Sequence, residues 1–124
     1  MATIKSFTDI SQSKTLSTIL PLESADMFMF NNVGESGKVD GTNTSVIFKE
    51  YFNPLAKAPE ILPCWSLAAL LNVLPEGYSS ILTKSFNGKD YYCKLDGKPI
   101  EIMADNPVDA CVEMIEKLNE LKML

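Results

Sequence analysis

The sequence contains no histidine. Without an imidazole, the protein cannot build a Ser-His-Asp or Cys-His nucleophile or a histidine metal site. Its cysteines, Cys64, Cys93 and Cys111, are odd in number, lie far apart and form no Cys-x-x-Cys motif. This pattern favours reduced, buried thiols in a cytoplasmic protein over a disulfide framework or a zinc site. We therefore expect no metal and no cofactor.

Long apolar runs and an excess of positive charge are also missing. The longest uninterrupted apolar run, from Leu67 to Leu71, is far too short to span a membrane, and no apolar signal segment follows Met1. The formal net charge is -5 and the pI is about 4.6. Proteins that bind nucleic acid neutralise phosphates with Lys and Arg, and anionic membranes also attract basic surfaces. The acidic charge therefore argues against both kinds of partner.

The length of the chain predicts one folded domain, residues 1–124. The clearest element is a helix over Asn106–Leu121, with Asn106 as its N-cap and Pro107 at the first helical position. Apolar residues recur in it at spacings of three and four and predict one buried stripe. This stripe consists of Val108, Cys111, Val112, Ile115, Leu118 and Leu121.

Weaker signals place the remaining helices and strands. Pro63 opens a second predicted helix over Cys64–Leu74. A short third helix is predicted to begin at Asp9, with Gln12 completing a capping box and Pro21 ending the helix. We predict strands over 27–30 and 46–51, separated by a Gly- and Asn-rich loop over 31–43.

Two turn motifs predict a β-meander between the last two helices. Asn87-Gly88 and Asp96-Gly97 are both typical of two-residue hairpin turns. Such turns would pair Leu82 with Cys93, and Cys93 with Ile100. Because side chains alternate along a strand, one face of the meander then becomes apolar. That face collects Leu82, Phe86, Tyr91, Cys93, Leu95, Ile100, Ile102 and Ala104, with Lys84 as the odd member.

The fold class that follows is α+β: an antiparallel β-meander of three to five strands with two amphipathic helices packed on one face. The opposite face mixes apolar and polar side chains, which is typical of surfaces that bind a partner. Either the two N-terminal strands extend or cover this sheet, or the face stays open. If it stays open, the candidate partner surface consists of Ile81, Thr83, Tyr92, Lys94, Glu101 and Met103.

Three other groups of residues are candidates for chemical sites. Cys64 stands at the predicted N-terminus of a helix, which could lower its pKa, but the chain has no histidine base to activate it. Glu113, Glu116 and Glu120 share a helical ridge that could bind a cation, although solvated ridges of this kind are ordinary. The segment 34–39 is too short for a phosphate-binding loop. We therefore expect no enzyme and predict no catalytic residue.

The layout of residues 63–124 resembles small uncharacterised proteins of phages and prophages. A helix, the strands around Asn87-Gly88, a third strand and a final helix opened by Asn106-Pro107 are similar to the phage ABA sandwich domain. A looser similarity is to HicB-type antitoxins, in which a three-stranded meander also leads into a helix. This chain lacks the DNA-binding tail that those proteins often carry, and no activity or functional residue comes with either resemblance.

Together these observations lead to one expectation and two alternatives. The expectation is a cytoplasmic accessory protein of phage or prophage origin that binds another protein or associates with itself. The first alternative is an antitoxin-like neutraliser of a small toxin, as the HicB-like layout implies. The second is a small enzyme that uses carboxylates or Cys64.

Overall fold

The computed structural model describes residues 5–31, 44–51, 61–75, 80–85 and 88–124, and these form an α+β protein. Its helices are α1 (Ile10–Ile19), α2 (Leu67–Val73) and α3 (Pro107–Glu120). Its strands are β1 (Met27–Asn31), β2 (Thr44–Phe48), β3 (Ile61–Cys64), β4 (Ser80–Lys84), β5 (Tyr91–Leu95) and β6 (Glu101–Ala104). Two short 3-10 helices, η1 (Leu22–Ser24) and η2 (Lys49–Tyr51), follow α1 and β2.

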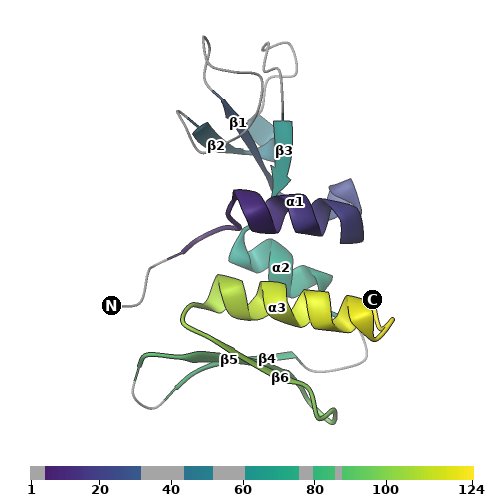
Figure 1. Ribbon diagram of the computed structural model, residues 1–124. Helices are drawn as coiled ribbons and strands as arrows, with labels where there is room; N and C mark the ends of the chain where they lie inside the picture. Colours follow the sequence, from purple (N-terminus) through teal and green to yellow (C-terminus); the bar gives the residue numbers. More distant parts are fainter. Residues whose placement is uncertain (1–4, 32–43, 52–60, 76–79, 86–87) are drawn as a thin grey trace.

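The strands form two separate antiparallel sheets, with the three helices stacked between them (Figure 1). One sheet has the order β2-β1-β3 and the other the order β4-β5-β6. The three-stranded meander is confirmed, but the suggestion that the N-terminal strands extend or cover it is wrong. Instead, β1 pairs with β2 and β3, and α1 packs against β3. The predicted packing also needs a correction, because α3 contacts β5 and β6 directly whereas α2 packs mainly against α3.

The second predicted helix begins three residues late, at Leu67 rather than Cys64. Cys64 is the last residue of β3, where it pairs with Met27. Pro63 lies inside the same strand, and a proline is tolerated there because β3 is an edge strand. Ser66 is the true N-cap, since its hydroxyl accepts a hydrogen bond from the backbone N–H of Ala69 at 3.2 Å.

The caps predicted for the other two helices are confirmed. Asp9 caps α1 by accepting a hydrogen bond from the Gln12 N–H at 2.8 Å, and the Gln12 side chain accepts one from the Asp9 N–H at 3.1 Å. Asn106 caps α3 by accepting a hydrogen bond from the Asp109 N–H at 2.8 Å. These contacts, reciprocal at α1 only, satisfy N–H groups that have no partner within the helix.

The meander has the predicted register in its first hairpin and a different one in its second. Leu82 pairs with Cys93 as expected, whereas Cys93 pairs with Ile102 rather than with Ile100. The expected register would have placed Pro99, which has no N–H, opposite Lys94 within the ladder. The chain instead turns at Gly97, which has a φ of 82°, and pairing resumes beyond Pro99. A shift of two residues keeps the side chains of β5 and β6 on their predicted faces. Phe86, predicted on the apolar face, lies outside the described residues.

The main core lies between α3, α2, α1 and the inner face of the meander. Trp65, Leu70, Cys93, Ile115 and Leu118 are fully buried in it. A smaller cluster lies between α1 and the other sheet, where buried side chains of β1 and β3 meet. Its buried members are Met27, Met29, Leu62 and Cys64. The helical layer therefore joins two sheets whose described strands share no strand pairing (Figure 1).

Candidate functional site

The candidate partner surface predicted from the sequence comes together on one face of the meander. One row across the three strands places Thr83 opposite Tyr92, and Tyr92 opposite Met103. A second row places Ile81, Lys94 and Glu101 side by side. We call these residues, Ile81, Thr83, Tyr92, Lys94, Glu101 and Met103, the outer face of the meander.

The helical layer lies on one side of this sheet (Figure 1). Leu82, Cys93 and Leu95, which alternate with the outer face along the strands, pack into the core on that side, so the outer face points away from the helices. Met103 is 57% exposed, Thr83 is also exposed, and Tyr92 and Ile81 are half-buried. Lys94 and Glu101 are exposed neighbours of opposite charge on adjacent strands. An aromatic ring and a methionine flanked by adaptable polar groups can bury apolar area and donate or accept hydrogen bonds at a protein interface.

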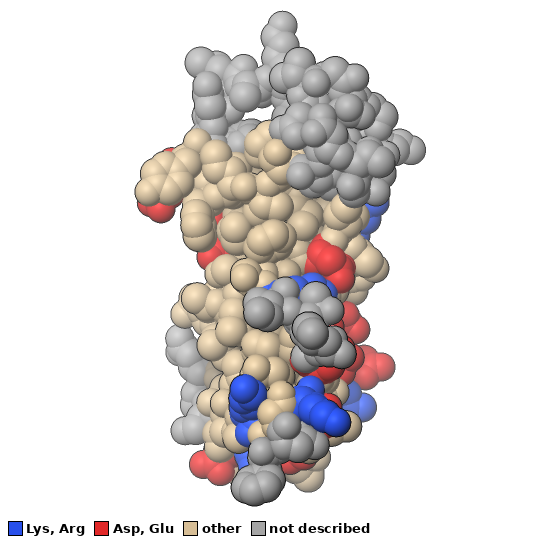
Figure 2. Space-filling view, turned by 90° about the vertical axis from the view of Figure 1, so that its left-hand side faces the viewer, with Lys and Arg blue, Asp and Glu red and all other residues tan. Residues whose placement is uncertain are grey.

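Charge is unevenly distributed over the molecule. Figure 2 shows that charged side chains gather in the half that contains the meander and α3, while much of the visible surface near the other sheet is uncharged. The sheet β2-β1-β3 turns a largely apolar face away from α1, with Phe28 between Ile47 and Pro63 in one row. The sequence carries a signal for that face, because all four residues of Met27–Phe30 are apolar. Side chains alternate along a strand, so such a segment presents apolar side chains on both sides of its sheet.

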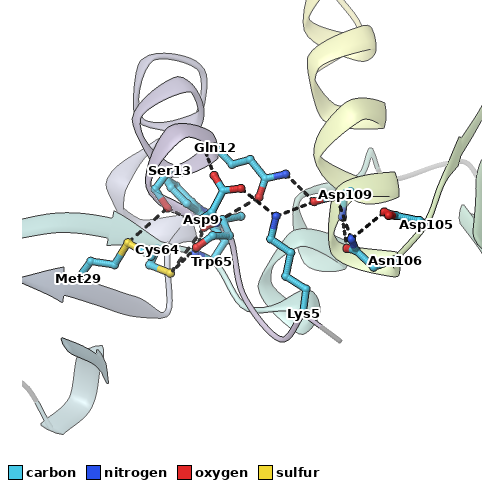
Figure 3. Close-up of polar contacts among 11 residues, drawn as sticks. Lys5, Asp9, Gln12, Ser13, Met29, Cys64, Trp65, Asp105, Asn106 and Asp109 are labelled. Atoms are coloured by element: carbon cyan, nitrogen blue, oxygen red, sulfur yellow. Dashed lines mark hydrogen bonds and ion pairs between the residues drawn. The ribbon is translucent and has the colours of Figure 1, made fainter. Parts of the chain in front are cut away.

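A polar network joins the N-terminal ends of α1 and α3 (Figure 3). The Asp109 carboxylate accepts hydrogen bonds from Lys5 Nζ and Gln12 Nε2, both at 2.7 Å, and from Asn106 Nδ2 at 2.8 Å. Lys5 also forms an ion pair with Asp9 at 2.9 Å. The sequence had not indicated this network, because the segments that carry Lys5 and Asp109 lie at opposite ends of the chain.

The network shifts the ionisation of its charged members. Partial burial works against the charge of Asp109, but the hydrogen bonds from Lys5, Gln12 and Asn106 outweigh it and lower the pKa of that carboxyl. Partial burial likewise opposes the charge of Lys5, and the hydrogen bonds to Asp109 and Asp9 outweigh it and raise its pKa. Both pKa shifts favour the charged forms of Lys5 and Asp109, which form an ion pair. This ion pair helps to hold the N-terminal ends of the two helices together. It has the character of a structural contact.

The surroundings of Cys64 do not resemble those of a nucleophile. The thiol is fully buried and donates a hydrogen bond to the carbonyl oxygen of Thr8 at 3.4 Å. Burial raises the pKa of Cys64, and this raised value is the opposite of the shift expected at a helix N-terminus. The Thr8 hydroxyl in turn accepts a hydrogen bond from the Trp65 N–H at 3.1 Å. Cys64 is therefore a packed thiol in the junction between β3 and α2.

The glutamate ridge on α3 is exposed and borders a hollow. Glu113, Glu116 and Glu120 line this hollow together with Thr15 and Ile19 of α1, and its volume is about 380 Å³. Partial burial, together with the nearby charges of Asp109, Glu116 and Asp105, raises the pKa of Glu113. Within the part of the chain that the structure describes, no group of three or more His, Cys, Asp or Glu side chains is placed to hold a metal ion. The segment 34–39, considered above as a phosphate-binding loop, lies outside the described residues.

Comparisons with known proteins add no further assignment. No family model matches the chain, and neither a curated protein nor a solved structure shows significant similarity to it. Among the described residues, no helix is both long enough and apolar enough to cross a membrane.

Proposed function

We propose that this chain is an accessory protein, of phage or prophage origin, that acts by binding another protein through the outer face of the meander. The observation that carries the proposal is the row Thr83–Tyr92–Met103, which crosses all three strands of one sheet. Its aromatic and methionine side chains lie on the face opposite the core, so the fold does not need them there for its own packing. Such residues supply much of the binding energy at protein interfaces.

Contact with a protein is favoured over contact with other classes of partner. The net charge of -5 disfavours nucleic acid and anionic membranes. The buried Cys64 thiol and the exposed glutamates offer no assembled pair of acid and base, so we infer a role that needs neither catalysis nor a cofactor. The mixed apolar and polar character of the outer face suits an interface that can form and dissociate.

A tagged pull-down from bacterial lysate, combined with light scattering, tests the proposal. We expect the wild-type chain to retain a stoichiometric partner or to associate with itself, and the Tyr92→Ala/Met103→Ala variant to lose that association. The control is Tyr51→Ala/Leu22→Ala, which removes an exposed aromatic and an exposed aliphatic side chain elsewhere, 69% and 55% exposed respectively. Thermal unfolding should show nearly unchanged stability for both variants.

The outcomes of this experiment separate the possible roles of the face. Equal association by both variants would exclude the outer face as the binding surface. If the Tyr92→Ala/Met103→Ala variant unfolds, these side chains belong to the structural core and the proposal is wrong. A wild-type chain that stays monomeric and retains nothing would likewise contradict it.

An antitoxin-like role is a narrower form of the same proposal. The observation that favours it is the order of elements, a three-stranded meander that leads directly into the capped helix α3. Co-expression with a small toxin encoded beside this protein would test it, because neutralisation should depend on Tyr92 and Met103. The lack of any such neighbouring toxin would count against it.

A further inference from the structure

A groove runs between α1 and α3, away from the outer face of the meander. The two helices lie side by side and point in the same direction, with their N-terminal ends joined through Asp109 (Figures 1 and 3). Two hollows lie between these helices, on the side of the C-terminal ends of α1 and α3. Both are lined by Ile19 and Asn119. They are neighbouring hollows, and we refer to the two together as the α1–α3 groove.

One end of the α1–α3 groove is largely apolar. This hollow has a volume of about 630 Å³ and lies where the C-terminal ends of all three helices meet. Its apolar lining comes from Leu20, Pro21, Val73, Pro75, Met123 and Leu124. Leu124 is 48% exposed, so part of this apolar surface faces solvent and remains available for contact.

The other end of the α1–α3 groove is acidic. Glu113, Glu116 and Glu120 line it, and Lys117 is its one basic lining residue among those described. The Lys117 ammonium lies 3.8 Å from Glu120, at an exposed position where it offsets only part of the negative charge. Partial burial is the largest cause of the raised pKa of Glu113, and the nearby charges of Asp109, Glu116 and Asp105 add to it.

We propose that the α1–α3 groove binds an amphipathic, basic peptide segment of a partner protein. Apolar side chains of that segment would occupy the hollow beside Leu124, and its Lys or Arg side chains would lie against the glutamates. Along α3, the stretch from Glu113 to Glu120 corresponds to about 10 Å at 1.5 Å per residue, which matches about two turns of a bound helix.

The charges in the groove decide between this occupant and others. A nucleic acid or another anionic ligand would be repelled by the glutamates. A resident metal ion is disfavoured because the described side chains do not converge in a metal-binding group. A neutral apolar ligand would leave the acidic end unused, whereas a basic amphipathic segment complements both ends.

The test uses a fluorescent 14-residue peptide of Leu and Lys that is apolar on one helical face, with binding followed by anisotropy at low salt. Glu116→Gln/Glu120→Gln should weaken binding about fivefold, as expected for the loss of two partly exposed ion pairs. The matched control, Glu50→Gln/Asp96→Asn, removes the same charge from exposed sites outside the groove and outside the outer face of the meander, and should leave the affinity unchanged.

The apolar end is tested with a second pair of variants. Leu124→Ser should weaken binding of the same peptide about threefold, because it removes apolar contact area. Leu22→Ser is its control, since Leu22 is exposed to a similar extent and does not line the groove. A peptide of identical composition, rearranged so that neither face is apolar, should bind at least about tenfold more weakly.

Several outcomes would overturn the proposal. Equal affinity for the rearranged peptide would mean that the acidic protein attracts any basic chain. Equal effects of the groove variants and their controls would place binding elsewhere. Loss of peptide binding in the Tyr92→Ala/Met103→Ala variant would assign the peptide to the outer face of the meander. That variant should otherwise bind the peptide normally, which keeps this proposal separate from the proposed function.

Discussion

Replacing Asp109 with Asn should destabilise the protein by weakening the joint between α1 and α3. One Asp109 oxygen accepts hydrogen bonds from Lys5 and Gln12, and the other accepts one from Asn106. An asparagine offers one oxygen and one NH2 group in the same space. In one orientation the NH2 group of the asparagine faces the donors of Lys5 and Gln12, and in the other it faces the donor of Asn106. In both orientations the ion pair between residue 109 and Lys5 is lost.

The size of the effect follows from these contacts. The Asp109 side chain is 28% exposed, so its charged hydrogen bonds are partly screened, and losing one outright contributes about 1.5 kcal/mol. Asp109 also lies in the first turn of α3, where a negative charge contributes about 0.5 kcal/mol. We expect the free energy of unfolding at pH 7 to fall by about 2 kcal/mol and the Tm by about 8 °C.

The same reasoning fixes how the effect depends on pH. The pKa of Asp109 is lowered from its usual value of 3.8, so its contribution is fully present above pH 3.8 and is lost as the pH falls through the lower, folded-state value. The pKa of Lys5 is raised from 10.5, so its contribution is present below pH 10.5 and is lost as the pH rises through the higher value. The difference between wild type and variant should therefore be constant from pH 5 to 9 and shrink below pH 3.8.

Urea unfolding followed by circular dichroism at pH 7 and at pH 3 measures this difference. Asp96→Asn is the control, because it removes one carboxylate charge from an exposed turn and should change stability by less than about 0.5 kcal/mol. A loss at pH 7 no larger than that of the control would refute the assigned role of Asp109. A loss that stays the same at lower pH would show that the charge of Asp109 does not matter.

Two further predictions concern the core. Leu118→Ala should lower the free energy of unfolding by about 3 kcal/mol, because Leu118 is fully buried. Leu121→Ala, at the C-cap of the same helix where the side chain is 47% exposed, should change it by less than about 1 kcal/mol. Urea unfolding checks both, and similar losses would contradict the packing of α3. The thiols of Cys64, Cys93 and Cys111 should react with a disulfide reagent only as fast as the protein unfolds, since all are fully buried and the pKa values of Cys64 and Cys111 are raised. Rapid reaction of a thiol in the native protein, measured by absorbance, would contradict this prediction and would support a chemical role for that cysteine.

Local signals predicted the local structure well. The capping box at Asp9 and the N-cap at Asn106 each marked a helix start correctly, because a cap is made by residues within one turn. The Asn87-Gly88 motif predicted the pairing of Leu82 with Cys93 correctly. The alternation along β4, β5 and β6 then placed all of the predicted outer face on one side of the sheet.

The features that the sequence did not reveal depend on segments far apart in the chain. Pro63 was read as the start of a helix, and only the pairing of β3 with β1 shows that it lies in an edge strand. The separation of the two sheets and the contact between Lys5 and Asp109 likewise depend on contacts between segments far apart in the chain. The α1–α3 groove also requires two helices whose packing no local motif specifies.

The position of α3 in the chain has a consequence for folding during synthesis. This helix contacts α1, α2, β5 and β6, so it holds together elements made at very different times. Until the ribosome has released the residues from Pro107 onward, the apolar side of the meander and the facing side of α2 have no cover. The nascent chain therefore carries exposed apolar surface that chaperones can recognise. The packing of the meander and α2 therefore waits until α3 emerges.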